Sequence, residues 1–219
     1  MLIKGLSVKI RDRLILNEVG LEFIKGLNVI LGPNGSGKTT LLRCIIGMIK
    51  PSEGRIEIEE KEKSYSPAEF FSAEMNVMDV LLAGGSKKDY MRYLKLLGID
   101  NFINRNFSTL STGEKRLVLI AKALAEGDLV LIDEPTSGLD LKNQINVRNI
   151  LSSLKDKMII TCTHDISIAT IADRVALLKE GRIIAQGEPV NVLTEELLSD
   201  LYGVKIKRIW VDDRNFVFV

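Results

Sequence analysis

The sequence has no apolar run long enough to cross a bilayer, and it is poor in several chemically informative residues. Two cysteines and one histidine occur among its 219 residues, and aromatic residues make up 5%. A membrane-spanning helix needs about 20 consecutive apolar residues, and no stretch approaches that length. The first residues, MLIKGL, lack the charged and then apolar order of a secretory signal. We therefore expect a cytosolic protein that reaches a membrane only through a partner.

The net charge and the positions of the cysteines indicate which partners and which cellular compartment to expect. Thirty basic and 29 acidic residues give a formal net charge of +1, so no general electrostatic field attracts nucleic acid. Cys44 falls in a predicted helix and Cys162 in a predicted strand, and buried free thiols of this kind indicate a reducing compartment. We expect a globular protein with no nucleic-acid partner.

One glycine-rich stretch, GPNGSGKTT, carries the strongest chemical signal. It matches the pattern of a phosphate-binding loop, with a predicted buried strand before it and a predicted helix after it. Glycines allow successive backbone N–H groups to face one anion, and the helix N-terminus favours phosphate. The lysine can reach the β- and γ-phosphates, and the following threonine can ligate Mg²⁺. The predicted nucleotide-binding residues are Gly32, Pro33, Asn34, Gly35, Ser36, Gly37, Lys38, Thr39 and Thr40.

Strands and helices alternate along most of the chain. Short strands predicted within residues 1–24 form an antiparallel β layer before the phosphate loop. Buried strands at 129–133 and 158–162 alternate with helices at 117–125 and 141–154. This alternation predicts an α/β fold whose central sheet is mainly parallel, with right-handed crossovers.

The segment from Asn76 to Asn104 differs from the rest of the chain. Its apolar residues recur at helical spacing, interrupted by Gly84-Gly85, which predicts a helical insertion. We expect one domain over residues 1–219. Its core would comprise 1–75 and 115–219, and its small helical subdomain about 76–114.

Two carboxylates follow the predicted strand at 129–133. Asp133 ends this strand and Glu134 comes next, at the carboxyl edge where open α/β sheets bind ligands. Phosphoryl chemistry needs one acid to hold the Mg²⁺ shell and another to position or deprotonate the attacking water. Alone, the pair also fits a helix N-cap. Behind a phosphate loop, it predicts Asp133 as a metal-binding residue, together with Thr39, and Glu134 as the general base.

Three more stretches, LSTGE, SGLD and TCTHD, follow in a particular order. With them the sequence resembles the ATP-binding cassette (ABC) family over almost its whole length. The resemblance implies a signature motif containing Ser111 and Gly113, a loop containing Asp140 after the catalytic glutamate, and a switch histidine at His164. It also implies that two cassettes sandwich two ATP molecules head to tail.

The residue types of the signature suit this role. Ser111 and Gly113 begin a predicted helix and can present a hydroxyl, N–H groups and a positive dipole end to a phosphate. Ser111 and Glu114 also match a capping box, which is compatible with that function. Because the chain's own loop already holds its own nucleotide, the signature would close over ATP held by a second copy, giving a homodimer. Lys38, Glu134 and His164 form the predicted catalytic set, since a neutral imidazole can hydrogen-bond the γ-phosphate.

The sequence departs from the family pattern at two positions. The family usually places an aromatic residue before the first turn to stack on adenine, where this chain has Ile10. Ile10 itself or a nearby arginine remain alternatives for packing on the base. The family glutamine that contacts Mg²⁺ and water corresponds to Ala68, so either Glu69 replaces it or the contact is absent. The neighbouring Phe70-Phe71 pair is either core or partner-facing.

The sequence outside these motifs indicates which branch of the ABC family the chain resembles. A single phosphate loop argues against two-cassette translation factors, and the short insertion excludes coiled-coil DNA-repair ATPases. GEPVNVLTEELL and LYGV near the C-terminus resemble ATPases of iron-siderophore, haem and cobalamin importers. The residues after them, 205–219, predict a β-hairpin.

This resemblance implies an ATP-hydrolysing importer subunit for a metal complex or cobalamin-like solute. It would lie on the inner face of the membrane, bound to permease subunits that dock near the helical insertion and the Ala68 loop. An extracytoplasmic substrate-binding protein is a further implied partner. An exporter ATPase and a catalytically degenerate regulatory cassette remain alternatives.

Overall fold

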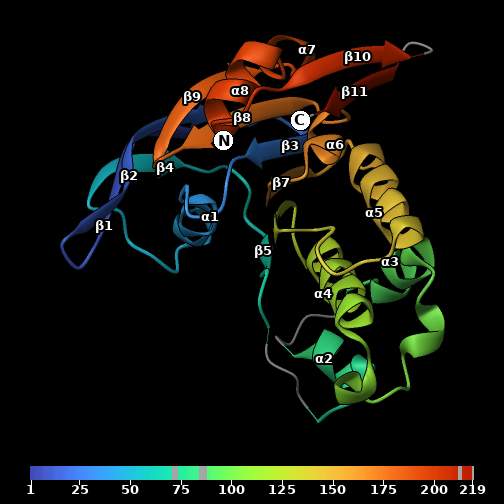
Figure 1. The fold of residues 1–219 in the computed structure, drawn as a ribbon. Coiled ribbons are helices and arrows are strands. Elements are labelled where there is room, and N and C mark those ends of the chain that lie inside the picture. Colours follow the sequence, from blue (N-terminus) through green and yellow to red (C-terminus); the bar gives the residue numbers. More distant parts are fainter. Residues whose placement is uncertain (71–73, 84–87, 212–213, 219) are drawn as a thin grey trace.

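The computed structural model describes residues 1–70, 74–83, 88–211 and 214–218, and its largest layer is a six-stranded sheet (Figure 1). The strand order is β5-β6-β7-β3-β8-β9. The first five strands of this order run parallel and the last is antiparallel at the edge. The strands are β3 (Gly26–Leu31), β5 (Lys63–Ser66), β6 (Leu129–Asp133), β7 (Met158–Thr163), β8 (Arg174–Lys179) and β9 (Arg182–Gly187). The mainly parallel sheet expected from the sequence is confirmed.

A second sheet of three antiparallel strands covers the N-terminal part, as predicted. It has the order β2-β1-β4 and contains β1 (Leu2–Ile10), β2 (Arg13–Glu22) and β4 (Glu53–Glu57). The apolar pattern predicts two short strands at 14–16 and 21–24, where the structure has the single strand β2. The cause is an irregular ladder, since the register of β1 and β2 shifts between Leu6 and Val8 and Glu18 has a positive φ of 51°. Such bulges break the alternating apolar pattern.

Helix α1 (Lys38–Ile46) lies between the two sheets. Its buried residues Leu41, Leu42 and Ile45 share one apolar cluster with strands from both layers. The helix starts at Lys38, two residues before Thr40, where the apolar pattern predicts its start. Cys44 of α1 and Cys162 of β7 are both buried free cysteines, as predicted, and burial raises the pKa of Cys44 to about 11.

The other face of the six-stranded sheet is covered by a second apolar cluster. Leu27, Val29 and Leu31 of β3 belong to this cluster, whereas Ile30 belongs to the cluster around α1, because successive strand residues point to opposite faces. The covering helices are α4 (Thr112–Glu126), α5 (Leu141–Ser153), α6 (Ile166–Ala169), α7 (Pro189–Val192) and α8 (Glu195–Tyr202).

Between β5 and β6 the chain is helical, and this part extends away from the three-stranded sheet (Figure 1). It contains α2 (Val77–Leu82), α3 (Tyr90–Leu97) and the 3₁₀-helices η1 (Asp100–Phe102) and η2 (Phe107–Thr109). Its buried residues Leu81 and Tyr93 belong to the same cluster as the central sheet. The division into a core of 1–75 and 115–219 and a helical subdomain of 76–114 stays a prediction, and α4 spans the proposed boundary.

The C-terminal residues form the expected hairpin. Strands β10 (Lys207–Val211) and β11 (Arg214–Phe218) pair antiparallel in a sheet of their own. Of the two phenylalanines after Ala68, Phe70 is half-buried beneath a guanidinium, and Phe71 lies outside the described residues. Within the described part of the chain, every helix is too short or too polar to cross a bilayer.

Candidate functional site

The glycine-rich loop joins β3 to α1 and forms one wall of a pocket of about 720 Å³, a volume typical of small-molecule sites. Gly37 has a φ of 107° and is the N-cap residue immediately before α1. A Cβ at this position would lie 2.7 Å from the Leu16 side chain, so the turn requires glycine. The pocket is lined by Arg13, Leu14, Ile15, Asn34, Gly35, Gly37, Lys38, Thr39, Thr40, Ala68, Glu134 and Glu180.

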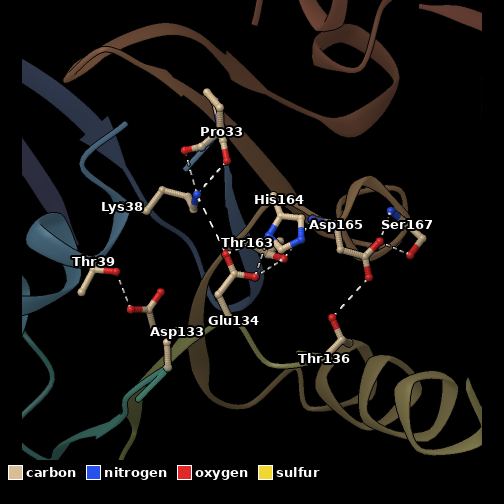
Figure 2. Close-up of polar contacts among 12 residues, drawn as sticks. Pro33, Lys38, Thr39, Asp133, Glu134, Thr136, Thr163, His164, Asp165 and Ser167 are labelled. Carbon is tan, nitrogen blue, oxygen red and sulfur yellow. Dashed lines mark hydrogen bonds and ion pairs between the residues drawn. The ribbon is translucent and has the colours of Figure 1, made fainter. Parts of the chain in front are cut away.

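Lys38 is held inside this pocket by the loop itself (Figure 2). Its Nζ donates to the carbonyls of Gly32 at 2.7 Å and Pro33 at 3.0 Å, and it lies 3.9 Å from Glu134 Oε1. The side chain is 7% exposed. Gly32 and Pro33 therefore hold the lysine through their carbonyls, although they do not line the pocket. A phosphate entering this space would find a positioned cation.

Asp133 contacts Thr39 in the first turn of α1 (Figure 2). Thr39 Oγ1 donates to Asp133 Oδ2 at 2.6 Å. Asp133 is 1% exposed, and its Oδ1 has no hydrogen-bond partner among the described residues. Burial raises the pKa of Asp133, while the bond from Thr39 opposes this shift. A buried carboxylate oxygen without a partner, beside a hydroxyl, suits a hard cation such as Mg²⁺.

Glu134 and His164 face each other across the end of β7. Thr163 Oγ1 donates to Glu134 Oε2 at 3.1 Å, and His164 Nδ1 lies 3.1 Å from the same carboxylate. Glu134 has a positive φ of 50°, a conformation that costs energy for a residue other than glycine and often marks an active site. The arrangement brings a carboxylate, an imidazole and the Lys38 ammonium together.

Arg116 is a residue of this site that the sequence reasoning missed. It is 4% exposed, and its Nη1 donates to the carbonyls of Asp133 at 3.3 Å and Glu134 at 3.0 Å. Its Nη2 donates to the Ala68 carbonyl at 2.5 Å. Burial lowers the pKa of Arg116, and the two carboxylates oppose this effect. A charged residue directly before the apolar run LVLI was the available signal.

The structure does not bring every predicted residue to the pocket. Ser111 caps α4 in the expected capping box, with Glu114 N–H donating to Ser111 Oγ at 3.2 Å. Asp140 caps α5 by accepting from the Asn143 N–H at 2.8 Å. Gly113 packs closely against Gly138, whose carbonyl would lie 2.9 Å from an added Cβ. Ser111, Gly113 and Asp140 are not among the residues that line the pocket.

Of the two departures from the family pattern, Ala68 lines the pocket and Ile10 does not. Ile10 is 43% exposed and is not a lining residue, whereas Arg13 and Leu14 line the pocket beyond the phosphate loop. Ala68 lines the pocket, while its neighbour Glu69 is exposed and does not. The geometry therefore favours an absent contact at position 68 over replacement by Glu69.

A phosphate loop after β3 and two acids at the carboxyl end of β6, a parallel strand separated from β3 only by β7, define a P-loop nucleoside triphosphatase. The chain belongs to the ABC transporter family, whose model matches residues 16–137. It is an ATP-binding subunit of an ABC transporter complex and hydrolyses ATP.

Curated relatives and solved structures agree with this membership. The chain is 30% identical to the hemin import ATP-binding protein HmuV of Photobacterium damselae subsp. damselae, over 97% of this chain and 92% of HmuV. It is 32% identical to an ATP-binding protein of Helicobacter pylori strain J99 assigned to iron chelatin transport, over 99% and 98%. A solved inward-facing ABC transporter assigned to the metal-chelate type superposes with a TM-score of 0.86 at 29% identity, over 99% of this chain and 94% of that chain.

Proposed function

We propose that this chain powers the import of a metal complex, such as haem, a ferric chelate or a cobalamin-like solute. The names of its relatives, which concern hemin and iron chelatin, support this class of solute. The GEPVNVLTEELL and LYGV stretches of the sequence point to the same branch. The cassette itself would not contact the solute and would supply only the energy of ATP hydrolysis.

The observation that carries the catalytic proposal is that Lys38, Thr39 and Glu134 line one pocket, with Asp133 bonded directly to Thr39. Lys38 would leave the loop carbonyls and bind the β- and γ-phosphates. Thr39 Oγ1 and Asp133 would hold Mg²⁺, which when bound neutralises charge on those phosphates. Asp133 supplies the buried oxygen without a partner that such an ion needs.

The proton of the attacking water would pass to the Glu134 carboxylate. Thr163 and His164 hold this carboxylate, so its orientation is fixed before the nucleotide binds. Because Nδ1 of His164 faces Glu134, Nε2 is the ring nitrogen left to contact the γ-phosphate or the water. The nucleotide would be enclosed only when a second cassette joins.

The second cassette is proposed to be an identical chain. Ser111 and Asp140 are exposed and Gly113 is half-exposed, and all three lie outside the pocket of their own chain. A head-to-tail homodimer would place them over the partner's γ-phosphate, where the N-terminus of α4 favours negative charge.

The permease is proposed to dock beside the loop that contains Ala68. A groove of about 710 Å³ lies next to this loop and contains Arg43, Met48 and Tyr65. Met48 is 67% exposed, so the groove presents both apolar surface and positive charge. The exposed residues Met78 and Leu82 of α2 extend the apolar surface of the helical segment. An extracytoplasmic binding protein would deliver the solute to this permease.

The direct test is transport. Proteoliposomes would contain this cassette with its cognate permease, and uptake of labelled haem, ferric chelate and cobalamin would be measured with Mg²⁺-ATP. We expect ATP-dependent uptake of one of them, abolished by Glu134→Gln in the cassette. Movement of solute in the opposite direction would identify an exporter. ATP binding without turnover in the intact complex would identify a degenerate cassette, to which the alanine at position 68 would contribute.

A further inference from the structure

Thr163, the last residue of β7, and the two residues after it are each hydrogen-bonded to a different part of the molecule. Thr163 Oγ1 donates to Glu134 and accepts from the Asp165 N–H at 3.0 Å. Asp165 Oδ2 accepts from Thr136 Oγ1 at 3.3 Å (Figure 2). The main-chain carbonyl of His164 accepts from Tyr202 Oη at 3.1 Å. This last contact comes from α8, an element with no assigned part in the chemistry.

Helix α8 is well anchored, so it can fix the phenol. Leu198 and Leu201 are buried at 0% and 2% exposure. Thr194 caps the helix by accepting from the Leu197 N–H at 3.2 Å. The Ser199 hydroxyl accepts from the Ile206 N–H at 2.9 Å, which ties the following segment to the helix. Tyr202 is therefore the last residue of a helix held at its start, middle and end.

The hydroxyl of Tyr202 acts as a donor over the whole physiological range. Burial raises the pKa of Tyr202, and the carboxylates of Glu134 and Asp165 raise it further. The phenol stays protonated, and the carbonyl of His164 can only accept. The bond therefore has one direction and sets the position of the backbone that carries the imidazole.

We propose that Tyr202 is a positioning residue for ATP hydrolysis, acting through His164. By holding the His164 carbonyl, it keeps the imidazole against Glu134 and so extends the catalytic machinery into α8. This inference rests on the proposed catalytic role of His164. Tyr202 would touch neither nucleotide nor metal, and the pocket lining does not include it.

The test replaces Tyr202 by phenylalanine, which keeps the ring packing and removes only the hydroxyl. One neutral hydrogen bond corresponds to a change of roughly three- to tenfold, so kcat should fall by about that factor. KM for ATP should stay within about twofold, because Tyr202 does not line the nucleotide pocket. The matched control is Tyr90→Phe, which removes a tyrosine hydroxyl bond to Glu126 outside the pocket and should leave kcat unchanged.

A second measurement separates positioning from general damage. His164 is the only histidine of the chain, so the imidazole of untagged protein gives a single set of NMR signals. Tyr202→Phe should move or broaden these signals without nucleotide, and Tyr90→Phe should not. Unmoved imidazole signals in Tyr202→Phe, or an equal loss of kcat in both variants, would overturn the proposal. The NMR measurement needs no turnover, so it tests the positioning by Tyr202 separately from the catalytic role of His164. A normal kcat in His164→Ala would refute that catalytic role.

Discussion

The two ends of the nucleotide pocket are built in opposite ways. At the phosphate end Lys38 is 7% and Asp133 1% exposed, and both are held by short hydrogen bonds. At the far end Leu14 is 44% exposed and Arg13 is exposed as well. One end is preorganised and shielded from water, whereas the other is an open apolar and cationic edge.

This contrast indicates where the free energy of binding and catalysis comes from. Charge-assisted contacts in a shielded site are worth more than contacts made by exposed side chains. Contacts to the triphosphate should therefore dominate both ATP affinity and turnover, and contacts to the adenine ring should contribute little. Changes at the phosphate end should have the larger effects.

The largest effect is expected for Glu134→Gln. Loss of the general base should lower kcat by roughly 10²–10⁴-fold, while ATP affinity should change little because the amide keeps the shape of the side chain. Phosphate release and nucleotide titration measure the two quantities. Glu59→Gln, at an exposed carboxylate that does not line the pocket, serves as control. Equal turnover in wild type and Glu134→Gln would refute the assigned base.

The next effect is expected for Lys38→Ala. Removal of a charged donor buried in the pocket should weaken ATP binding by roughly 10- to 100-fold. Calorimetric titration with ATP measures it, and an exposed lysine outside the pocket, Lys50→Ala, provides the matched comparison. Unchanged affinity would count against the phosphate-loop assignment.

Asp133→Asn should separate stability from activity. The pKa of Asp133 in the native state is raised above its ordinary value of about 3.8. In the pH range in which this carboxyl loses its proton, the native state therefore binds more protons than the unfolded state. Wild-type stability without Mg²⁺ and nucleotide therefore decreases over that range. The variant lacks this decrease and should be more stable at pH 7 by about 0.5–2 kcal/mol, but should lose Mg²⁺-dependent turnover. Denaturant unfolding at several pH values tests this, and a less stable variant would contradict it.

The smallest effect is expected at the open end. Ile10→Tyr should raise the affinity for ATP and GTP alike by about two- to tenfold, since one aromatic contact is worth about 0.5–1.5 kcal/mol, and should leave kcat unchanged. Competition binding of the two nucleotides to wild type and variant measures it. No gain in nucleotide affinity would indicate that the nucleotide's purine ring packs against Leu14 instead of residue 10.

The sequence predicted the phosphate end better than its surroundings. Lys38, Asp133 and Glu134 were identified because each lies in a local motif beside a buried strand. The contacts of Arg116 and of Tyr202 were not, since they join residues far apart in the chain through carbonyl groups that leave no mark in a sequence pattern. The same holds for the β8–β9 turn, where the Gly181 amide donates to the Ser36 carbonyl at 3.0 Å. Strands β8 and β9 were missed altogether, although their turn supplies Glu180 to the pocket.

The position of β3 in the sheet also bears on how the protein is made. The phosphate loop is synthesised early, but β3 pairs with β7 and β8, which are formed by residues 158–163 and 174–179. At ribosomal rates, the interval between translating the loop and translating β8 is on the order of ten seconds. During most of that time the nascent chain contains the complete loop without either flanking strand. ATP bound to the loop can therefore stabilise the complete sheet only after β7 and β8 have been translated.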